Sequence, residues 1–324
     1  MSRAPLSFIV VLTILSVASG FVDLRTRAYP ARPYQEFIPR VVDGTADAPE
    51  KYRVLVPFTL DAVAQVTGMT PAPLWHLSRL ALFWAAYLVF FTYLRTWLAR
   101  HEALLGTAIV AATLPLTFTN SWAHPDHIAE LALFTAGCLA IARRQNGWTF
   151  ILLAAAALNR ETAVFLIPLY FLAAPLTRRR VALTGLLLLE WGAIYLGLRL
   201  WRGFQHYDYW QIGRNLEFLR LLPQNYDPYY RAYAYFGIVL FGSLGAIAVL
   251  RGRNAARPLF VTRALWVVPM VGVVAFAISS IIESRIFTPI YPLVMPAVMF
   301  ALLPADRSTS FPSVNERPEN ERHA

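Results

Sequence analysis

The chain has 324 residues, of which 57% are hydrophobic and only 15% are charged. Soluble domains carry about 25% charged residues, so this composition, with a mean hydropathy of +0.47, excludes an ordinary water-soluble globule and a disordered chain. The net charge of +10 comes almost entirely from arginines in short clusters between apolar runs, which is typical of cytoplasmic loops and not of a nucleic-acid-binding face. The single cysteine, Cys138, excludes an internal disulfide.

The apolar runs predict an all-α, polytopic transmembrane bundle with about ten membrane segments, because a helix needs about 20 apolar residues to cross a bilayer. The predicted segments are 6–22, 73–94, 103–119, 127–142, 148–158, 162–176, 181–200, 232–250, 264–281 and 288–303. The first segment has small residues at its end, as a cleaved signal peptide has, but a lone Arg3 before it favours a retained span.

The segments 148–158 and 162–176 are predicted to be a pair of short helices that return to the same side. A single span across both would bury Arg160 and Glu161 near the bilayer centre, at a cost of several kcal/mol each. The resulting topology puts both termini in the cytoplasm of a multi-pass protein of the inner (plasma) membrane. The membrane domain is 1–303, and the polar stretch 304–324 is predicted to be a disordered cytoplasmic tail.

The acid-bearing loops all fall on the non-cytoplasmic face in this topology. In the first of them, Asp43 and Asp47 are four residues apart around a glycine. Such a pair can hold a divalent cation or supply a general base. The alternative is a solvated turn, since Asp and Gly are common turn residues.

Arg53 follows in the same loop and precedes an apolar stretch to Val66 that is too short to span a bilayer. This stretch predicts an interfacial helix with Asp61 turned to water. At headgroup depth the Arg53 guanidinium could grip a phosphate through two donors, or it could be a plain interface anchor. A second interfacial helix is predicted at 212–222, and the aromatic residues of 203–231 suit either an interfacial belt or stacking platforms for a sugar or an isoprenoid.

The motif His124-Pro125-Asp126-His127 invites a zinc interpretation. Pro125 disfavours a regular helical presentation and no third and fourth ligand is evident, so a turn with Asp126 at the start of a helix is the better interpretation. Glu130 lies one turn further on and faces either the protein interior or a wet cavity.

Arg160 and Glu161, at the tip of the two short helices, need either each other or a polar cavity. Broken helices at membrane depth are tolerated where they are buried in protein or line a cavity, and this favours a functional site. Thr162 could also cap the second short helix. The same pairing of arginine and acid recurs at Glu283 and Arg285.

These motifs together resemble bacterial membrane proteins of the GT-C glycosyltransferase fold class. The resemblance is carried by Tyr52–Pro57, Asp126, Asn159–Thr162, and Glu283–Arg285 ahead of Pro289 and Pro292. It implies transfer of a sugar from a polyprenyl-phosphate donor to an envelope glycan, lipid or protein acceptor on the non-cytoplasmic face.

The resemblance also implies roles for individual residues. An acid of the first outer loop serves as catalytic base, sometimes with a divalent cation such as Mg or Mn, and the matching residues are Asp43 and Asp47. The frequent Asp-x-Asp pattern is absent from this loop. The expected substrate-binding residues are Arg53, Asp126, Arg160, Glu161, Glu283 and Arg285.

Two other functions remain open at this point. One is a transporter or flippase of lipid-linked substrates, although charges gathered on one face argue against alternating access. The other is a non-catalytic assembly protein for envelope polymers, which would tolerate the loss of every acid named above.

Overall fold

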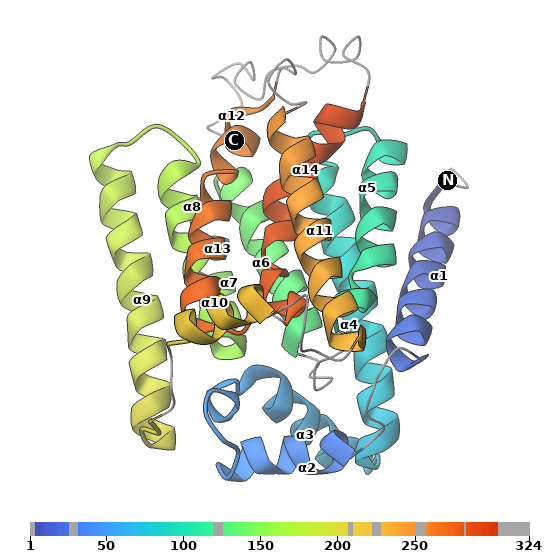
Figure 1. Cartoon of the computed structure of the whole chain (residues 1–324), viewed down its shortest axis with the longest axis vertical. Coiled ribbons are helices and arrows are strands. Elements are labelled where there is room, and N and C mark those ends of the chain that lie inside the picture. Colours follow the sequence, from blue (N-terminus) through green and yellow to red (C-terminus); the bar gives the residue numbers. More distant parts are fainter. Residues whose placement is uncertain are drawn as a thin grey trace, which may run out of the picture.

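The structure is a computed structural model that describes residues 4–25, 32–118, 126–206, 210–221, 228–250, 257–281 and 283–303. Every regular element in these ranges is helical (Figure 1). The α-helices are α1 (Ala4–Arg25), α2 (Arg32–Asp43), α3 (Leu55–Thr67), α4 (Pro71–Leu94), α5 (Arg100–Thr113), α6 (Asp126–Ala142), α7 (Asn146–Asn159), α8 (Leu166–Leu172), α9 (Arg178–Arg202), α10 (Ile212–Leu221), α11 (Pro228–Leu250), α12 (Leu259–Ala264), α13 (Val267–Ile278) and α14 (Ile290–Leu302). Short 3-10 helices are η1 (Glu50–Tyr52), η2 (Pro115–Phe118), η3 (Glu161–Phe165) and η5 (Ser284–Phe287).

Four helical stretches are long and apolar enough to cross a membrane. They are Pro73–Leu94, Arg100–Phe118, Arg178–Arg202 and Leu259–Ile278. The other apolar helices are shorter, for example Asn146–Asn159 and Ile290–Leu302. The chain is therefore an all-α protein with four candidate membrane spans.

Each of the ten predicted segments coincides with a helix or a pair of consecutive helices in the described ranges. The predicted pair of short helices corresponds to α7 followed by η3 and α8. A ten-segment topology, its orientation and the cellular location stay predictions, and the tail 304–324 lies outside the described residues.

The core is built around α4, which packs against α1, α5 and α6. Its inward face presents large aromatic side chains, and Phe83, Tyr87, Phe90 and Tyr93 are fully buried. The final helix, α14, packs against α5, α6, α11, α12 and α13, and nearly all of its side chains are buried. Burial of this kind fixes the relative positions of the helices that carry the site.

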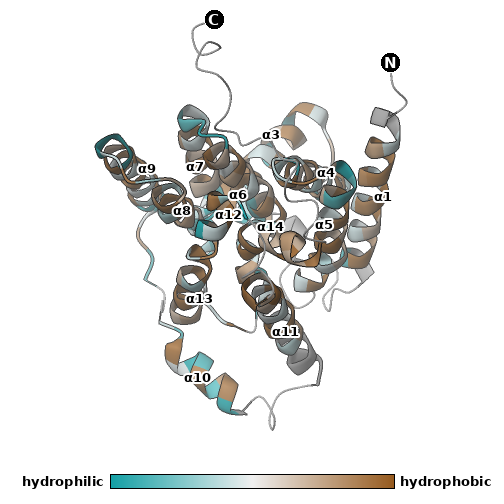
Figure 2. Cartoon of the chain, turned by 90° about the horizontal axis from the view of Figure 1, so that it is seen from above, coloured by the Kyte–Doolittle hydropathy of each residue, from teal (hydrophilic) through white to brown (hydrophobic). Residues whose placement is uncertain are grey.

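Helices at the edge of the bundle, such as α1 and α13, consist mostly of hydrophobic residues, as the hydropathy colouring in Figure 2 shows. On α9, Leu188, Leu189, Leu196 and Leu200 are exposed. Groups of exposed large apolar side chains mark surfaces that contact other molecules or a membrane, so this part of α9 is suited to contact with lipid.

The helices α2 and α3 lie across one end of the bundle (Figure 1). The carboxyl end of α9 is held against them, because Arg202 donates hydrogen bonds to the backbone oxygens of Val41 at 2.7 Å and Val42 at 3.1 Å. The Tyr52 hydroxyl donates to Gly203 O at 3.0 Å. These contacts bring the end of α2, η1 and the end of α9 together.

The two predicted interfacial segments are both helical. α3 covers the first, and Asp61 on it accepts a hydrogen bond from Gln65 at 2.7 Å. α10 covers the second and docks on the end of α13, where the buried Asn215 amide donates to Phe276 O at 2.6 Å and Ser279 O at 2.7 Å. This satisfies carbonyls that a helix end leaves without partners. The position of either helix in a membrane interface stays a prediction.

Candidate functional site

The break between α7 and η3 is the structural origin of the site. Arg160 is extended, with φ −160° and ψ 149°, between the last turn of α7 and the first turn of η3. Glu161 is the first residue of η3, so the backbone changes from extended to helical between the two residues. The side chains of Arg160 and Glu161 take different partners.

Arg160 points toward α6. Its Nη1 donates to Glu130 Oε2 at 2.8 Å and contacts Nδ1 of His127. The other oxygen of Glu130 accepts a hydrogen bond from the Thr162 hydroxyl. Both the Arg160 and Glu130 side chains are buried, so this pair ties the start of η3 to α6 about one turn from the start of that helix.

Glu161 points the other way, toward two arginines from distant parts of the chain. Its Oε2 lies 3.7 Å from Arg53 Nε, and its Oε1 lies 3.8 Å from Arg199 Nη2. Both distances are ion pairs that are too long for a hydrogen bond. Burial of Arg53 opposes its charge, but Glu161 and Asp126 outweigh that effect and hold the pKa of Arg53 above its ordinary value.

Asp126 is the first residue of α6 and lies close to Arg53 and Arg160. Its Oδ2 lies 3.5 Å from Arg53 Nη1 and 3.9 Å from Arg160 Nε, and neither carboxylate oxygen accepts a hydrogen bond within the described ranges. The Asn159 amide donates to the backbone oxygen of Asp126 at 2.9 Å. Asp126 is thus a buried carboxylate flanked by two guanidinium groups.

Arg285 extends the same network from η5. Its Nη1 lies 2.6 Å from His127 Nε2, and its Nε and Nη2 donate to Glu283 Oε2 at 2.9 and 2.7 Å. Burial opposes ionisation of Glu283, but Arg285 outweighs it and holds the pKa of Glu283 below its ordinary value. We call the whole group, Arg53, Asp126, His127, Glu130, Arg160, Glu161, Arg199, Glu283 and Arg285, the arginine–carboxylate cluster.

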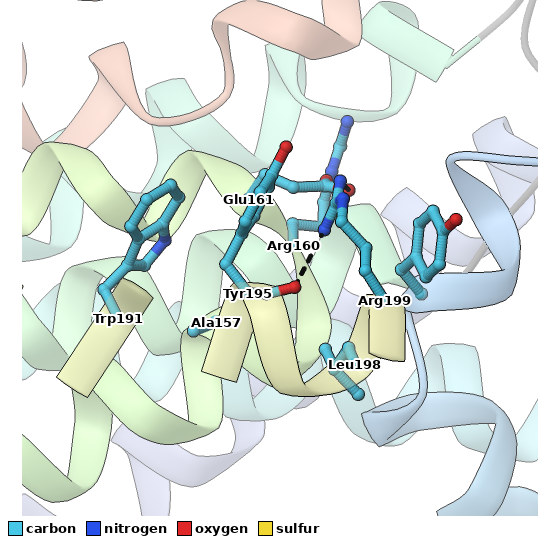
Figure 3. A pocket seen from close by; sticks show the side chains of 8 residues that line it. Ala157, Arg160, Glu161, Trp191, Tyr195, Leu198 and Arg199 are labelled. Atoms are coloured by element: carbon cyan, nitrogen blue, oxygen red, sulfur yellow. Dashed lines mark hydrogen bonds and ion pairs between the residues drawn. The ribbon is translucent and has the colours of Figure 1, made fainter. Parts of the chain in front are cut away.

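A small pocket opens on one side of the cluster (Figure 3). As described, it has room for about one water molecule. Trp191, Tyr195 and Arg199 line it from one face of α9, since they are four residues apart. The remaining lining residues are Tyr52, Ala157, Arg160, Glu161 and Leu198.

The two sides of the cluster differ in how completely they are hydrogen-bonded. On the Glu130 and Arg285 side the contacts are short and direct. On the side of Asp126 and Glu161, buried nitrogens of Arg53, Arg160 and Arg199 donate no hydrogen bond to any described residue. Buried polar atoms without partners call for an explanation such as a missing ligand, and those of Arg160, Glu161 and Arg199 belong to residues that line the pocket.

The structure brings together all six residues that the sequence predicts to bind substrate, but not the two predicted catalytic acids. Asp43 is exposed at the end of α2, and its Oδ1 accepts from the Thr45 hydroxyl at 2.7 Å and the Thr45 N–H at 2.9 Å. Asp47 is exposed and pairs with Arg40 at 3.2 Å. The Thr45 hydrogen bonds hold the pKa of Asp43 below its ordinary value, which makes it a weaker base.

The two acids that the sequence predicts to hold a divalent cation are not placed to share one. The described ranges contain no group of three or more His, Cys, Asp or Glu side chains placed to hold a metal. Asp43 turns to Thr45 and Asp47 turns to Arg40, so the two carboxylates do not converge on one point. His124, the other histidine of the zinc interpretation, lies outside the described residues.

Sequence reasoning missed the contribution of α9. Trp191, Tyr195 and Arg199 lie within a predicted span, where aromatic and basic residues near a helix end are explained by the membrane interface. Their spacing of four residues was the signal that could have grouped them on one face.

Comparison of the chain with protein-family models, with curated proteins and with solved structures finds no match in any of the three, so the cluster and its pocket carry the functional argument alone.

Proposed function

We propose that the chain is a membrane glycosyltransferase that moves a sugar from a polyprenyl-phosphate donor to an envelope glycan, lipid or protein acceptor. The observation that carries this proposal is a set of buried guanidinium nitrogens that donate no hydrogen bond to any described residue. They belong to Arg160 and Arg199, which line a pocket with aromatic walls, and to Arg53, which pairs with Glu161 of the same pocket. Arginine is the side chain best suited to grip a phosphate through several donors at once.

The place of the cluster in the fold fits a substrate that is part lipid. α9 presents exposed leucines on its outward face and lines the pocket with its other face. An isoprenoid chain could lie along that apolar surface while its phosphate reaches the arginines. Trp191 and Tyr195 offer flat apolar surfaces for a sugar ring or an isoprenoid.

The proposed reaction is an inverting substitution. The acceptor hydroxyl attacks the anomeric carbon, a carboxylate takes the hydroxyl proton, and the bond between the anomeric carbon and the phosphate oxygen breaks with its electron pair on the departing polyprenyl phosphate. Fixed guanidinium groups stabilise the charge that develops on that phosphate. Asp43 and Asp47 remain the bases implied by the family resemblance, while Glu161 is the carboxylate that lines the pocket.

The direct test is transfer of radiolabelled sugar from polyprenyl-phosphate donors into membrane fractions that contain the protein. We expect transfer by the wild-type chain and a fall of about 10- to 100-fold in Arg53→Gln, because a charge-assisted hydrogen bond contributes about 1.5–3 kcal/mol. Arg179→Gln, at the exposed opposite end of α9, is the matched control and should transfer normally.

The same assay assigns the base. Loss of transfer in an Asp43→Ala, Asp47→Ala double variant supports the loop acids, whereas wild-type transfer there removes them from the mechanism. If membranes that contain the folded wild-type chain transfer no sugar from any polyprenyl-phosphate donor, the proposed activity is wrong.

A further inference from the structure

The Arg199 guanidinium is held in place with its donors directed to the pocket side of the cluster. Its Cζ lies 3.4 Å from the ring centroid of Tyr195 and 4.4 Å from that of Tyr52, so two aromatic rings cover it. One of its nitrogens, Nη1, donates to Tyr195 O at 3.2 Å. Figure 3 shows Arg199 beside Tyr195 and Glu161 at the pocket.

Both rings that cover Arg199 are themselves fixed. The Tyr52 hydroxyl donates to Gly203 O and accepts from Gln205 N, each at 3.0 Å. Tyr195 belongs to the same helix as Arg199. The Arg199 side chain is only 4% exposed, yet its Nε and Nη2 donate no hydrogen bond to any residue in the described ranges. A desolvated guanidinium with two unused donors is costly unless an anion meets it.

Glu161 occupies the position where such an anion would sit. Its two carboxylate oxygens lie 3.7 Å from a nitrogen of Arg53 and 3.8 Å from a nitrogen of Arg199, which is too long for a hydrogen bond. The Glu161 side chain is 28% exposed, against 2% for Asp126, so it can turn outward without crossing the core. Glu161 therefore fits this position loosely and is the cluster carboxylate on this side that is free to leave it.

The charges of the cluster favour the replacement of Glu161 by another anion. With Glu161 in place, four arginines face four carboxylates, and the cluster is balanced. When Glu161 turns away, one positive charge is left uncompensated next to Arg53 and Arg199. A phosphate group then restores the balance and offers more oxygens to the unused donors than a carboxylate does.

We propose that the space between Arg53 and Arg199 is a phosphate-binding site and that Glu161 is a placeholder, which a phosphate displaces when it binds. This inference rests on the proposed function for the identity of its ligand, a phosphate carried by an isoprenoid, but its geometry does not depend on sugar transfer. Arg199, which sequence reasoning did not select, is one of the two residues that grip the phosphate.

Binding to the purified full-length chain in detergent, measured by titration calorimetry, tests the site. The probes are farnesyl phosphate, inorganic phosphate and farnesol. We expect farnesyl phosphate to bind, inorganic phosphate to compete with it, and farnesol, which lacks the phosphate, to bind at least tenfold more weakly. Tighter binding of farnesyl phosphate than of inorganic phosphate assigns the site to a lipid phosphate, and equal binding assigns it to a phosphate without a tail.

Two variants move the affinity in opposite directions. Arg199→Gln should weaken the binding of farnesyl phosphate by about 10- to 100-fold, and Glu161→Gln should strengthen it severalfold because the competing charge is gone. Arg179→Gln is the control for a change of charge on the same helix and should bind as the wild type does. Should Arg199→Gln fail to fold, Glu161→Gln decides alone.

Wild-type affinity in a folded Arg199→Gln, or affinity in Glu161→Gln that is equal to or below that of the wild type, overturns the inference. These outcomes are distinct from failure of the proposed function. If phosphate binds with the expected variant pattern but no sugar is transferred, the phosphate site is supported and the transferase function is wrong. If sugar is transferred but neither Arg199→Gln nor Glu161→Gln changes phosphate binding, the transferase function is supported and the phosphate site is wrong.

Discussion

Arg160 shows how a single extended residue organises the site. The sequence places it beside Glu161, but the two side chains take different partners, and Arg160 finds Glu130 at 2.8 Å on the neighbouring helix α6. Both partners are buried. Removing one member of a buried ion pair costs about 3–5 kcal/mol because the other charge is left uncompensated, whereas replacing both with apolar groups is often close to neutral.

We therefore expect Arg160→Met and Glu130→Met each to destabilise the protein by about 3–5 kcal/mol. The double variant should recover most of that loss. Thermal unfolding in detergent, followed by the fraction that stays monodisperse, measures this. Arg160→Met with Glu161→Met should show no such recovery, since those two residues are not partners. An equal recovery in both double variants would contradict the assignment of Glu130 as the partner.

At the scale of elements, buried polar contacts of Ser19 and Asp23 fix α1 to the rest of the bundle. Asp23 at the end of α1 pairs with Arg79 on α4, with Nη2 and Nε of Arg79 at 2.6 and 2.8 Å from Oδ2. The Ser19 hydroxyl donates to Ala111 O at 2.9 Å and accepts from Tyr87 at 2.7 Å. All these side chains are buried, so α1 packs into the bundle through specific contacts as well as apolar surface.

Asp23→Ala should accordingly loosen α1 and leave the Arg79 charge buried, at a cost of about 3–5 kcal/mol. Hydrogen exchange in detergent should show faster exchange in α1 and the facing turns of α4. Thr13→Ala removes only the exposed hydrogen bond from the Thr13 hydroxyl to Ile9 O within α1 and serves as the control. If hydrogen exchange in α1 is equally fast in Asp23→Ala and in the control, the Asp23–Arg79 pair does not hold the helix in place.

The sequence indicated the elements well because their causes are local. Apolar runs bounded by polar loops mark helices such as α4 and α9, and Arg160 with Glu161 marks the break between α7 and η3. The partners in the site could not be derived this way, because Glu130 and Arg160, or Arg53 and Glu161, are distant in sequence. The pocket face of α9 was hidden because its residues equally suit a membrane interface.

At the scale of the whole molecule, an apolar helical bundle carries the arginine–carboxylate cluster beside α3, α6, α7 and α9, apart from the buried Asp23–Arg79 pair between α1 and α4. Four of its helical stretches are long and apolar enough to cross a membrane. The exposed leucines of α9 and a pocket lined by aromatic rings and by Arg160 and Arg199 together suit a ligand with an apolar tail and an anionic head. We propose that this ligand is an isoprenoid phosphate.

Native mass spectrometry of the full-length protein, purified in a mild detergent, tests that claim most directly. We predict that the wild-type protein carries a lipid whose fragments are an isoprenoid series and a phosphate. Arg53→Gln should lose that lipid, and Arg179→Gln should retain it. A wild-type protein that carries only bulk phospholipids, in the same amounts as Arg53→Gln, would contradict the account.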